Sequence, residues 1–269
     1  MGVSAGPKIV TKNLQMFYDR AQDVASGANP GDASSVGVES IGKRQVTQSG
    51  IDVTSLAGGA LSFGTGDYVE IARSSSNDLG DIFGGGLSLT LEGWIYIQSF
   101  ANYGTLIQNA TGGSYSDTTA GLWIENTENQ ILFNLGTGNG DANAYGSFVR
   151  LYGQDYPYEI NKLYHIVGTA DDSVDEMKLY INGYLSASGS LIDDSGNSIG
   201  ELTSTRAKNS NPLQIGRRSS GSSAQLGGIV GYVAAYDRPL THDEVLQNYN
   251  TFYPRYQNAL DNYFASFGG

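Results

Sequence analysis

The chain has 269 residues, a length that could be two domains, although all-β sandwiches often reach it as one. It is 39% hydrophobic, which is enough for a core, and its 37 glycines against 6 prolines indicate many turns rather than a disordered linker. Its formal net charge of −12 disfavours nucleic acid and anionic membrane as partners. The sequence contains no run of about 18 apolar residues that could span a bilayer. The absence of cysteine excludes disulfides, thiolate nucleophiles and cysteine-ligated metals.

Residues 1–50 are expected to form an N-terminal arm, a first strand and a long connection. Apolar side chains alternate over Leu14–Tyr18, which predicts a short strand. Residues 19–50 are rich in Ala, Ser and Gly and predict a long surface connection. The first thirteen residues lack the apolar segment of a secretory signal. We therefore expect either a removed signal or a protein made and used without export.

Residues 51–254 are expected to form one sandwich, and its clearest strand is Leu87–Ile97. Leucines and isoleucines occupy one face of that strand, whereas Thr90, Glu92, Trp94 and Tyr96 share the other. Further strands are predicted at Ala60–Phe63, Asp67–Ile71, Thr105–Gln108, Gly121–Glu125, Gln130–Leu135, Ser147–Tyr152, Pro212–Gly216 and Gly228–Tyr236. Many short strands without intervening helical periods indicate a two-sheet antiparallel sandwich.

The stretch from Lys162 to Leu185 is predicted to form a three-stranded meander. Leu163–Thr169 is apolar and β-branched, and Met177–Ile181 alternates with period two. Asn182-Gly183 supplies the two positive-φ residues of a type I′ turn. Such a meander has an apolar face that only a second sheet can cover.

One helix is predicted to begin at the capping box Thr241–Glu244 and to end at Pro254. Residues 255–269 are predicted to form a separate helical tail, with apolar side chains at helical spacing. These side chains are Tyr256, Leu260, Tyr263, Phe264 and Phe267. Two interpretations stay open: the tail packs on its own sandwich, or it docks on a neighbouring copy or another protein.

Several of these segments together resemble the laminin-G-like branch of the concanavalin A-like lectin/glucanase superfamily. They are ALSFGTGDYVEI, LSLTLEGWIYIQSF, KLYHIVGTADDSVDEMKLYINGYL, PLQIGRR and GGIVGYVAAYDRPLTHDEVLQNYN. The resemblance implies an all-β fold, a two-sheet antiparallel jelly-roll sandwich of concanavalin A type, followed here by a short C-terminal helical segment.

The opening segment GPKIVTKNLQMFYDRA resembles the start of such domains in tailed-phage structural proteins. This implies a non-enzymatic structural or adhesive protein on the outer surface of the virion. Its expected partners are other virion proteins, copies of itself and host-surface polysaccharide. The alternative is a bacterial secreted or cell-surface glycan-binding lectin, and a third class is a polysaccharide-degrading enzyme with an unfamiliar acid pair.

Two departures from the family pattern bear on calcium. Val230-Gly231 stand where the family has Asp-Glu, and Phe63-Gly64 replace Phe-Asp-Gly, so two carboxylates are missing. Calcium needs about six oxygen ligands. We therefore expect no resident cofactor, and Asp171 and Asp172 are the first candidates if calcium is bound. Ordinary turn chemistry explains the same two residues.

No catalytic residues are expected, and the chain is predicted not to be an enzyme. Superfamily glucanases carry carboxylates at E-x-D-x-E spacing on one strand, and Glu92 is the lone acid on its strand. Both histidines, His165 and His242, are predicted to be structural, since neither accompanies a triad motif.

Glycan binding requires aromatic rings on an exposed strand face. Trp94, Tyr96 and Trp123 are the candidates, because Trp94 and Tyr96 share the polar parity of their strand. The competing interpretation is that a neighbouring strand or loop covers this face.

Overall fold

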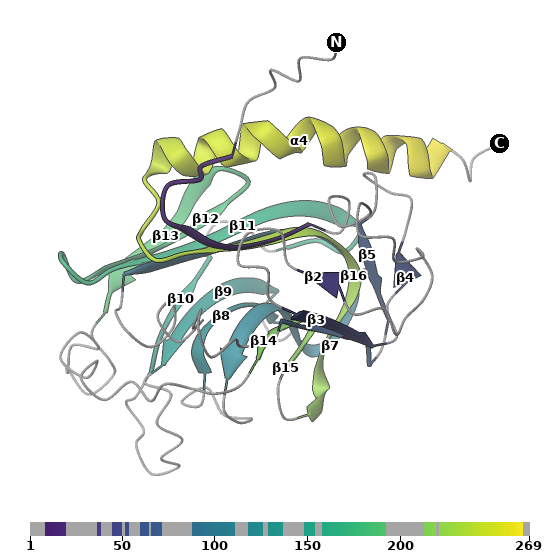
Figure 1. Ribbon diagram of the computed structural model, residues 1–269, viewed down its shortest axis with the longest axis horizontal. Coiled ribbons are helices and arrows are strands. Elements are labelled where there is room, and N and C mark those ends of the chain that lie inside the picture. Colours follow the sequence, from purple (N-terminus) through teal and green to yellow (C-terminus); the bar gives the residue numbers. More distant parts are fainter. Residues whose placement is uncertain are drawn as a thin grey trace.

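The computed structural model describes residues 9–19, 37–38, 45–49, 52–53, 60–64, 66–71, 88–110, 118–125, 129–136, 148–153, 158–191, 212–218 and 221–265. These residues form two antiparallel sheets and one long helix (Figure 1). The predicted all-β sandwich with a C-terminal helix is therefore confirmed.

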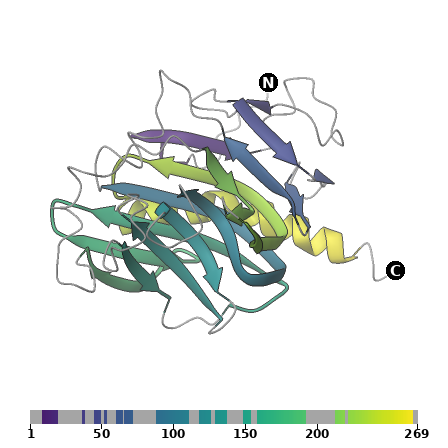
Figure 2. The same cartoon turned by 90° about the horizontal axis from the view of Figure 1, so that it is seen from below.

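Sheet A has the strand order β13-β12-β11-β7-β16, and the far side of β16 pairs with β1, β5 and β15. Its strands are β1 (Leu14–Asp19), β4 (Asp52–Val53), β5 (Leu61–Phe63), β11 (Lys162–Asp171), β12 (Glu176–Ile181), β13 (Tyr184–Ser190), β15 (Arg217–Arg218) and β16 (Gly221–Tyr236). Strand β4 adds to the sheet through β5. Seen from below, this sheet lies between the helix and the other sheet (Figure 2).

Sheet B has the order β10-β9-β8-β7-β14-β6-β3-β2. Its strands are β2 (Gly37–Val38), β3 (Gln45–Ser49), β6 (Tyr68–Ile71), β8 (Thr118–Glu125), β9 (Gln130–Gly136), β10 (Phe148–Tyr152) and β14 (Leu213–Ile215). Strands β2 and β3 lie within residues 19–50, so the prediction of a plain connection there is wrong. Strand β3 forms because its backbone pairs with β6, and the few large apolar side chains of this segment gave no pattern that predicts a strand.

Strand β7 (Leu89–Ala110) belongs to both sheets. The sequence predicted two separate strands here, because the polar residues between Ile97 and Thr105 resemble a break. The structure instead continues the ladder: residues 99–102 pair with β16, and residues 103–110 pair with β8. One bent strand therefore connects the two layers.

The core between the sheets is built from the aliphatic faces that the alternation predicted. Leu89, Leu91, Ile95 and Ile97 of β7 are all fully buried in it. The predicted meander is also confirmed: Asn182 and Gly183 have φ of 52° and 83° and connect β12 to β13. Gly168 lies directly against the ring of Phe133 from the opposite sheet, closer than a side chain at position 168 would allow.

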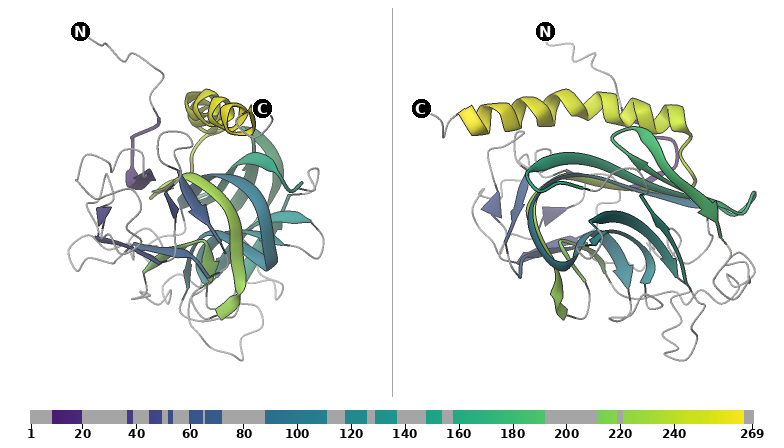
Figure 3. Two further views of the ribbon diagram at one scale, coloured as in Figure 1. Left: turned by 90° about the vertical axis from the view of Figure 1, so that its right-hand side faces the viewer. Right: turned by 180° about the vertical axis from the view of Figure 1, so that it is seen from behind.

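A single helix, α4 (His242–Ala265), lies across the outer face of sheet A as a third layer (Figures 1 and 3). The prediction that Pro254 ends the helix is wrong, because α4 continues through it. A proline in a helix interior costs about 3 kcal/mol, since it removes one backbone hydrogen bond and crowds the preceding turn. Burial of Phe252, Tyr256 and Leu260 on the sheet offsets that cost, at about 1.5–3 kcal/mol for each large apolar side chain.

Candidate functional site

The face of sheet A beneath α4 holds a buried acidic network. The Glu92 carboxylate, which is fully buried, accepts hydrogen bonds from the Tyr232 hydroxyl and from Asn248 Nδ2 at 2.8 Å. His165 Nε2 lies 2.7 Å from the same carboxylate. Burial, and then the nearby Glu92 charge, raises the pKa of Tyr232 well above its ordinary value, so the hydroxyl stays a donor. The network thus connects four elements: the strands β7, β11 and β16, and the helix α4.

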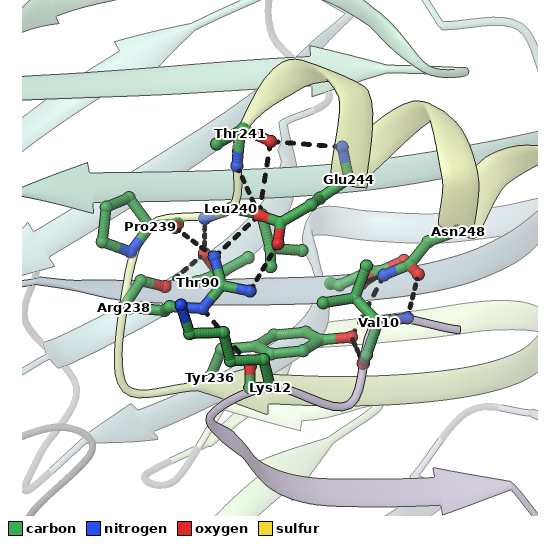
Figure 4. Close-up of polar contacts among 11 residues, drawn as sticks. Val10, Lys12, Thr90, Tyr236, Arg238, Pro239, Leu240, Thr241, Glu244 and Asn248 are labelled. Carbon is green, nitrogen blue, oxygen red and sulfur yellow. Dashed lines mark hydrogen bonds and ion pairs between the residues drawn. The ribbon is translucent and has the colours of Figure 1, made fainter. Parts of the chain in front are cut away.

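The same helix residue connects the network to the start of the described chain (Figure 4). Asn248 Oδ1 accepts from the Val10 backbone N–H at 2.8 Å, and Asn248 Nδ2 also lies 3.1 Å from the Tyr236 hydroxyl. Tyr236 in turn donates to the Val10 carbonyl at 3.1 Å. One asparagine therefore joins the N-terminal segment, the sheet and α4.

The predicted capping box is confirmed at the start of α4. Glu244 Oε2 accepts from the Thr241 backbone N–H at 2.9 Å, and Thr241 Oγ1 accepts from the Glu244 N–H at 3.3 Å. Arg238 adds a two-pronged ion pair to Glu244, with both contacts at 2.7 Å (Figure 4). The hydrogen bond from Arg238 is the main reason that the pKa of Glu244 lies below its ordinary value.

The glycan-stacking residues predicted from the sequence do not present their rings to solvent. Trp94, Tyr96 and Trp123 are 1%, 3% and 2% exposed. Trp94 stacks on His165 at 4.8 Å and on Tyr249 of α4 at 5.5 Å between ring centroids. The prediction that these rings are exposed is therefore wrong. The face of β7 that carries Trp94 and Tyr96 is covered, as the competing interpretation held, but by the helix α4 and not by a strand or loop.

The predicted docking stripe folds back on its own chain. Tyr256 and Leu260 are 4% and 7% exposed against sheet A, so an outward docking role is wrong for them. The side chains of Tyr263 and Phe264, and the whole of Phe267, lie outside the described residues. Gly231 explains the packing: a Cβ there would lie 2.4 Å from the Tyr256 ring. The absence of a side chain at position 231 therefore makes room for the helix.

Asp171 and Asp172 form a turn in the structure. Asp171 Oδ1 accepts from the backbone N–H and the hydroxyl of Ser173, at 3.0 and 2.6 Å, and the Asp172 N–H donates to Ser88 Oγ at 3.1 Å. Within the described ranges, no three acidic or histidine side chains gather closely enough to hold a metal ion. Calcium at these residues stays a prediction.

A pocket of about 290 Å³ opens beside the first turn of α4. The outward row of β11 and β12 forms one side, and the connection from β16 to the helix forms the other. Its lining comprises Thr169, Asp171, Glu176, Lys178, Tyr180, Pro239, Leu240, Thr241 and His242. None of these residues was assigned a pocket role from the sequence: Asp171 was a candidate for calcium, Thr241 was predicted to cap the helix and His242 was predicted to be structural.

The polar groups of this pocket come from rigid elements. Asp171 pairs directly with Glu176 across the two strands, and Lys178 Nζ lies 2.6 Å from Glu176 Oε2. Tyr180 stacks on His242 at 5.7 Å, and the His242 ring nitrogen Nε2 lies 3.1 Å from the Gly183 carbonyl oxygen. Burial raises the pKa of Tyr180, which keeps its hydroxyl protonated. The arrangement offers carboxylate acceptors, an ammonium donor and an aromatic wall.

A second polar feature crosses the outer face of sheet B. Gln214, Gln108 and Asn134 lie in one row, connected through Gly121 by direct cross-strand pairing. No described residue pairs with either amide atom of Gln108 or Asn134, and both side chains are fully buried. Such amides normally find partners, because leaving one unpaired costs about 1–3 kcal/mol. Sequence reasoning missed this row, although polar residues alternate with aliphatic ones on β14.

The sequence from residue 63 to residue 246 matches a laminin G model described as concanavalin A-like lectin/glucanases superfamily. The match covers well over half of the chain. The chain belongs to this superfamily. A search of curated proteins found no match.

Solved structures with the same superfamily fold include the receptor-binding domain of botulinum neurotoxin C/D mosaic serotype, with a TM-score of 0.61 and 17% identity. That alignment covers 90% of this chain and 52% of the neurotoxin chain. The binding domain of Paraclostridial mosquitocidal protein 1 aligns with a TM-score of 0.58 and 14% identity, over 90% and 53% of the two chains. Trypanosoma rangeli sialidase aligns with a TM-score of 0.57 and 18% identity, over 91% and 34%. The chain thus spans between a third and about half of these neighbours, and the likeness shows the lectin-like fold.

The superfamily match ends before most of α4, which continues from Gln247 to Ala265. The residues that fix the helix, Asn248 and Tyr256, therefore lie beyond the matched residues. No helix in the described part of the chain is long and apolar enough to cross a bilayer.

Proposed function

We propose that this chain is a non-enzymatic, glycan-binding adhesive protein displayed on the outer surface of a tailed-phage particle, and that the pocket beside α4 binds the glycan. One observation carries the proposal: an accessible pocket whose acidic, basic and aromatic groups are all fixed on strands or at the helix start. The Lys178 and Glu176 side chains are 32% and 40% exposed and can meet a ligand from solvent, whereas the side-chain amides of Gln108 and Asn134 in sheet B are fully buried.

The pocket chemistry suits a single sugar unit. Its volume lies at the low end of the roughly 300–1,000 Å³ range for small-molecule sites. Asp171 and Glu176 accept hydrogen bonds from sugar hydroxyls, and Lys178 and the Tyr180 hydroxyl donate. His242 and Tyr180 supply an aromatic edge against which the apolar face of a pyranose packs.

The glycan proposal is tested on an array of bacterial surface polysaccharides, with affinities measured by calorimetry. We expect Lys178→Met to weaken binding at least tenfold, about 1.4 kcal/mol. The matched control is Lys162→Met, because Lys162 forms an equivalent exposed ion pair with Glu159 at 2.5 Å, outside the pocket. Equal affinity of Lys178→Met and the unmodified protein would contradict the assignment of the pocket.

The virion role is supported by the resemblance of residues 6–21 to the start of such domains in phage structural proteins. In the structure, residues 14–19 of this segment form β1 and pair with β16. Mass spectrometry of purified particles is the test, and absence of the chain from them would end this part of the proposal.

Toxin receptor-binding domains among the structural neighbours support a second candidate, a bacterial secreted or cell-surface lectin. Detection in culture supernatant or on the cell surface, and not in particles, would favour it.

The non-enzymatic part of the proposal rests on the position of the acids. Glu92, the carboxylate beside His165, is fully buried and out of reach of a substrate. The pocket acid Glu176 is engaged by Lys178. Release of reducing sugar from a polysaccharide by the unmodified protein, and its loss in Glu176→Gln, would overturn this conclusion.

A further inference from the structure

Strand β13 (Tyr184–Ser190) forms one edge of sheet A. In the part of the chain that the structure describes, it pairs with β12 alone. The last four pairs of that ladder, from Leu179↔Ala187 to Glu176↔Ser190, are in regular register, with one bulge between them and the turn. An edge strand in regular register presents unpaired N–H and C=O groups that can accept another strand.

This edge lacks the side chains that natural proteins use to block such pairing. Its sequence, YLSASGS, contains no charged residue and no proline. Edge strands are commonly protected by lysine, proline or an inward charge. By comparison, β10, at one end of sheet B, carries Arg150. A neutral strand is notable in a chain with a net charge of −12.

Exposed apolar side chains gather at the turn end of the same strand. Tyr184 and Leu185 are 62% and 47% exposed, and Tyr253 on α4 is 40% exposed. Tyr249 connects them: it stacks on Tyr253 at 5.2 Å, and its pKa is raised by burial and then by Tyr253 and Tyr184 nearby. These four residues, the turn patch, flank the open edge on the helix side.

We propose that β13 pairs antiparallel with β13 of a second copy of this chain across a two-fold axis, joining two A sheets into one, with the turn patches covered at the junction. The two-fold makes the contact self-complementary, since the same patch serves both partners. Small side chains at Ser186–Gly189 allow two strands to approach closely.

Charge selects a second copy as the partner. Two chains that each carry a net charge of −12 repel one another over most orientations. The β13 edge and the turn patch carry no formal charge at pH 7, so this is a surface where like-charged copies can meet. A strongly basic partner would instead be drawn to the acidic remainder of the surface.

The first test is the mass of the full chain in solution by light scattering and sedimentation equilibrium, for which we expect a dimer. Ser188→Glu is the informative variant. Its new carboxylate lies opposite Lys178 within the same copy, which favours folding, but places two like charges near the two-fold. We expect its dimer dissociation constant to rise at least 100-fold. Ile160→Glu is the matched control, because Ile160 is 51% exposed and lies before β11, outside β13 and the turn patch.

The second test uses the absence of cysteine from the chain. Single cysteines are placed in turn at Ala187, Ser188 and Gly189, with Ile160→Cys as control. Paired antiparallel residues have Cα atoms about 4.5–5.5 Å apart, within the range that a disulfide spans. We expect the position nearest the two-fold to form a covalent dimer on oxidation. A monomer at tens of micromolar, a Ser188→Glu variant that dimerises like the unmodified protein, or no cross-linking above the control would each overturn the proposal. Glycan binding is measured separately, so either proposal can fail alone.

Discussion

Replacing Glu92 with alanine removes the acceptor at the centre of the buried network. The Tyr232 hydroxyl, His165 Nε2 and Asn248 Nδ2 all point at that carboxylate. All three side chains are buried between sheet A and α4. Each buried donor left without an acceptor costs about 1–3 kcal/mol. We therefore expect Glu92→Ala to lower the free energy of unfolding by about 4 kcal/mol.

The assay is equilibrium unfolding in urea, followed by circular dichroism, with the slope m fitted together with the midpoint. Glu159→Ala is the control, because the Glu159 side chain is 63% exposed and an ion pair as open to solvent as that with Lys162 contributes little to stability. Glu92→Gln should be less costly than Glu92→Ala, since its amide oxygen still accepts from Tyr232. A loss below about 1 kcal/mol in Glu92→Ala would refute the reasoning that this network holds α4 to the sheet.

Three further predictions concern α4. Pro254→Ala restores a helical hydrogen bond at an exposed position, so we expect the free energy of unfolding to rise by about 2 kcal/mol in urea titrations; a decrease would contradict the helix geometry. Tyr256→Ala opens a cavity over Gly231 and should cost about 3 kcal/mol, whereas Tyr253→Ala on the exposed side should cost less than about 1 kcal/mol. Arg238 holds the pKa of Glu244 below its ordinary 4.5, so this carboxylate stabilises the fold above about pH 4.5 and the contribution is lost as the pH falls through the lowered pKa. Glu244→Gln should therefore shrink the difference in unfolding midpoint between about pH 6 and about pH 3, and an unchanged difference would contradict the ion pair.

Sequence alternation predicted the sandwich well, because the period of two is imposed by the same burial that forms the core. Leu89 and Ile95 face inward as their parity requires. The sequence did not show whether the face of β7 that carries Trp94 is exposed, since the helix that covers Trp94, α4, lies some 150 residues later in the chain. The full length of that helix was not predicted, because a proline usually ends a helix, whereas packing on sheet A keeps α4 helical through Pro254.

The candidate pocket could not be predicted for a related reason. Lys178 and Tyr180 alternate outward on β12, which a sequence pattern assigns simply to solvent. They become walls of a pocket only because the β16–α4 connection returns beside them. His242 was predicted to be structural, and its stacking on Tyr180 and contact with Gly183 agree with that. The place of His242 in the pocket wall could not be predicted, because it depends on where the helix begins.

The hydrogen bond between Val10 and Asn248 has a mechanical consequence. It ties together residues 238 positions apart, and Figure 3 shows the N-terminal segment and the helix on the same side of the sandwich. A pull on the N-terminal segment therefore loads this hydrogen bond before it reaches β1, whereas a pull on the C-terminal part of α4 first loads the packing of Tyr256 and the Arg255–Asp19 ion pair. If the protein is tethered by one end, the contacts between α4 and sheet A therefore set the force at which unfolding begins.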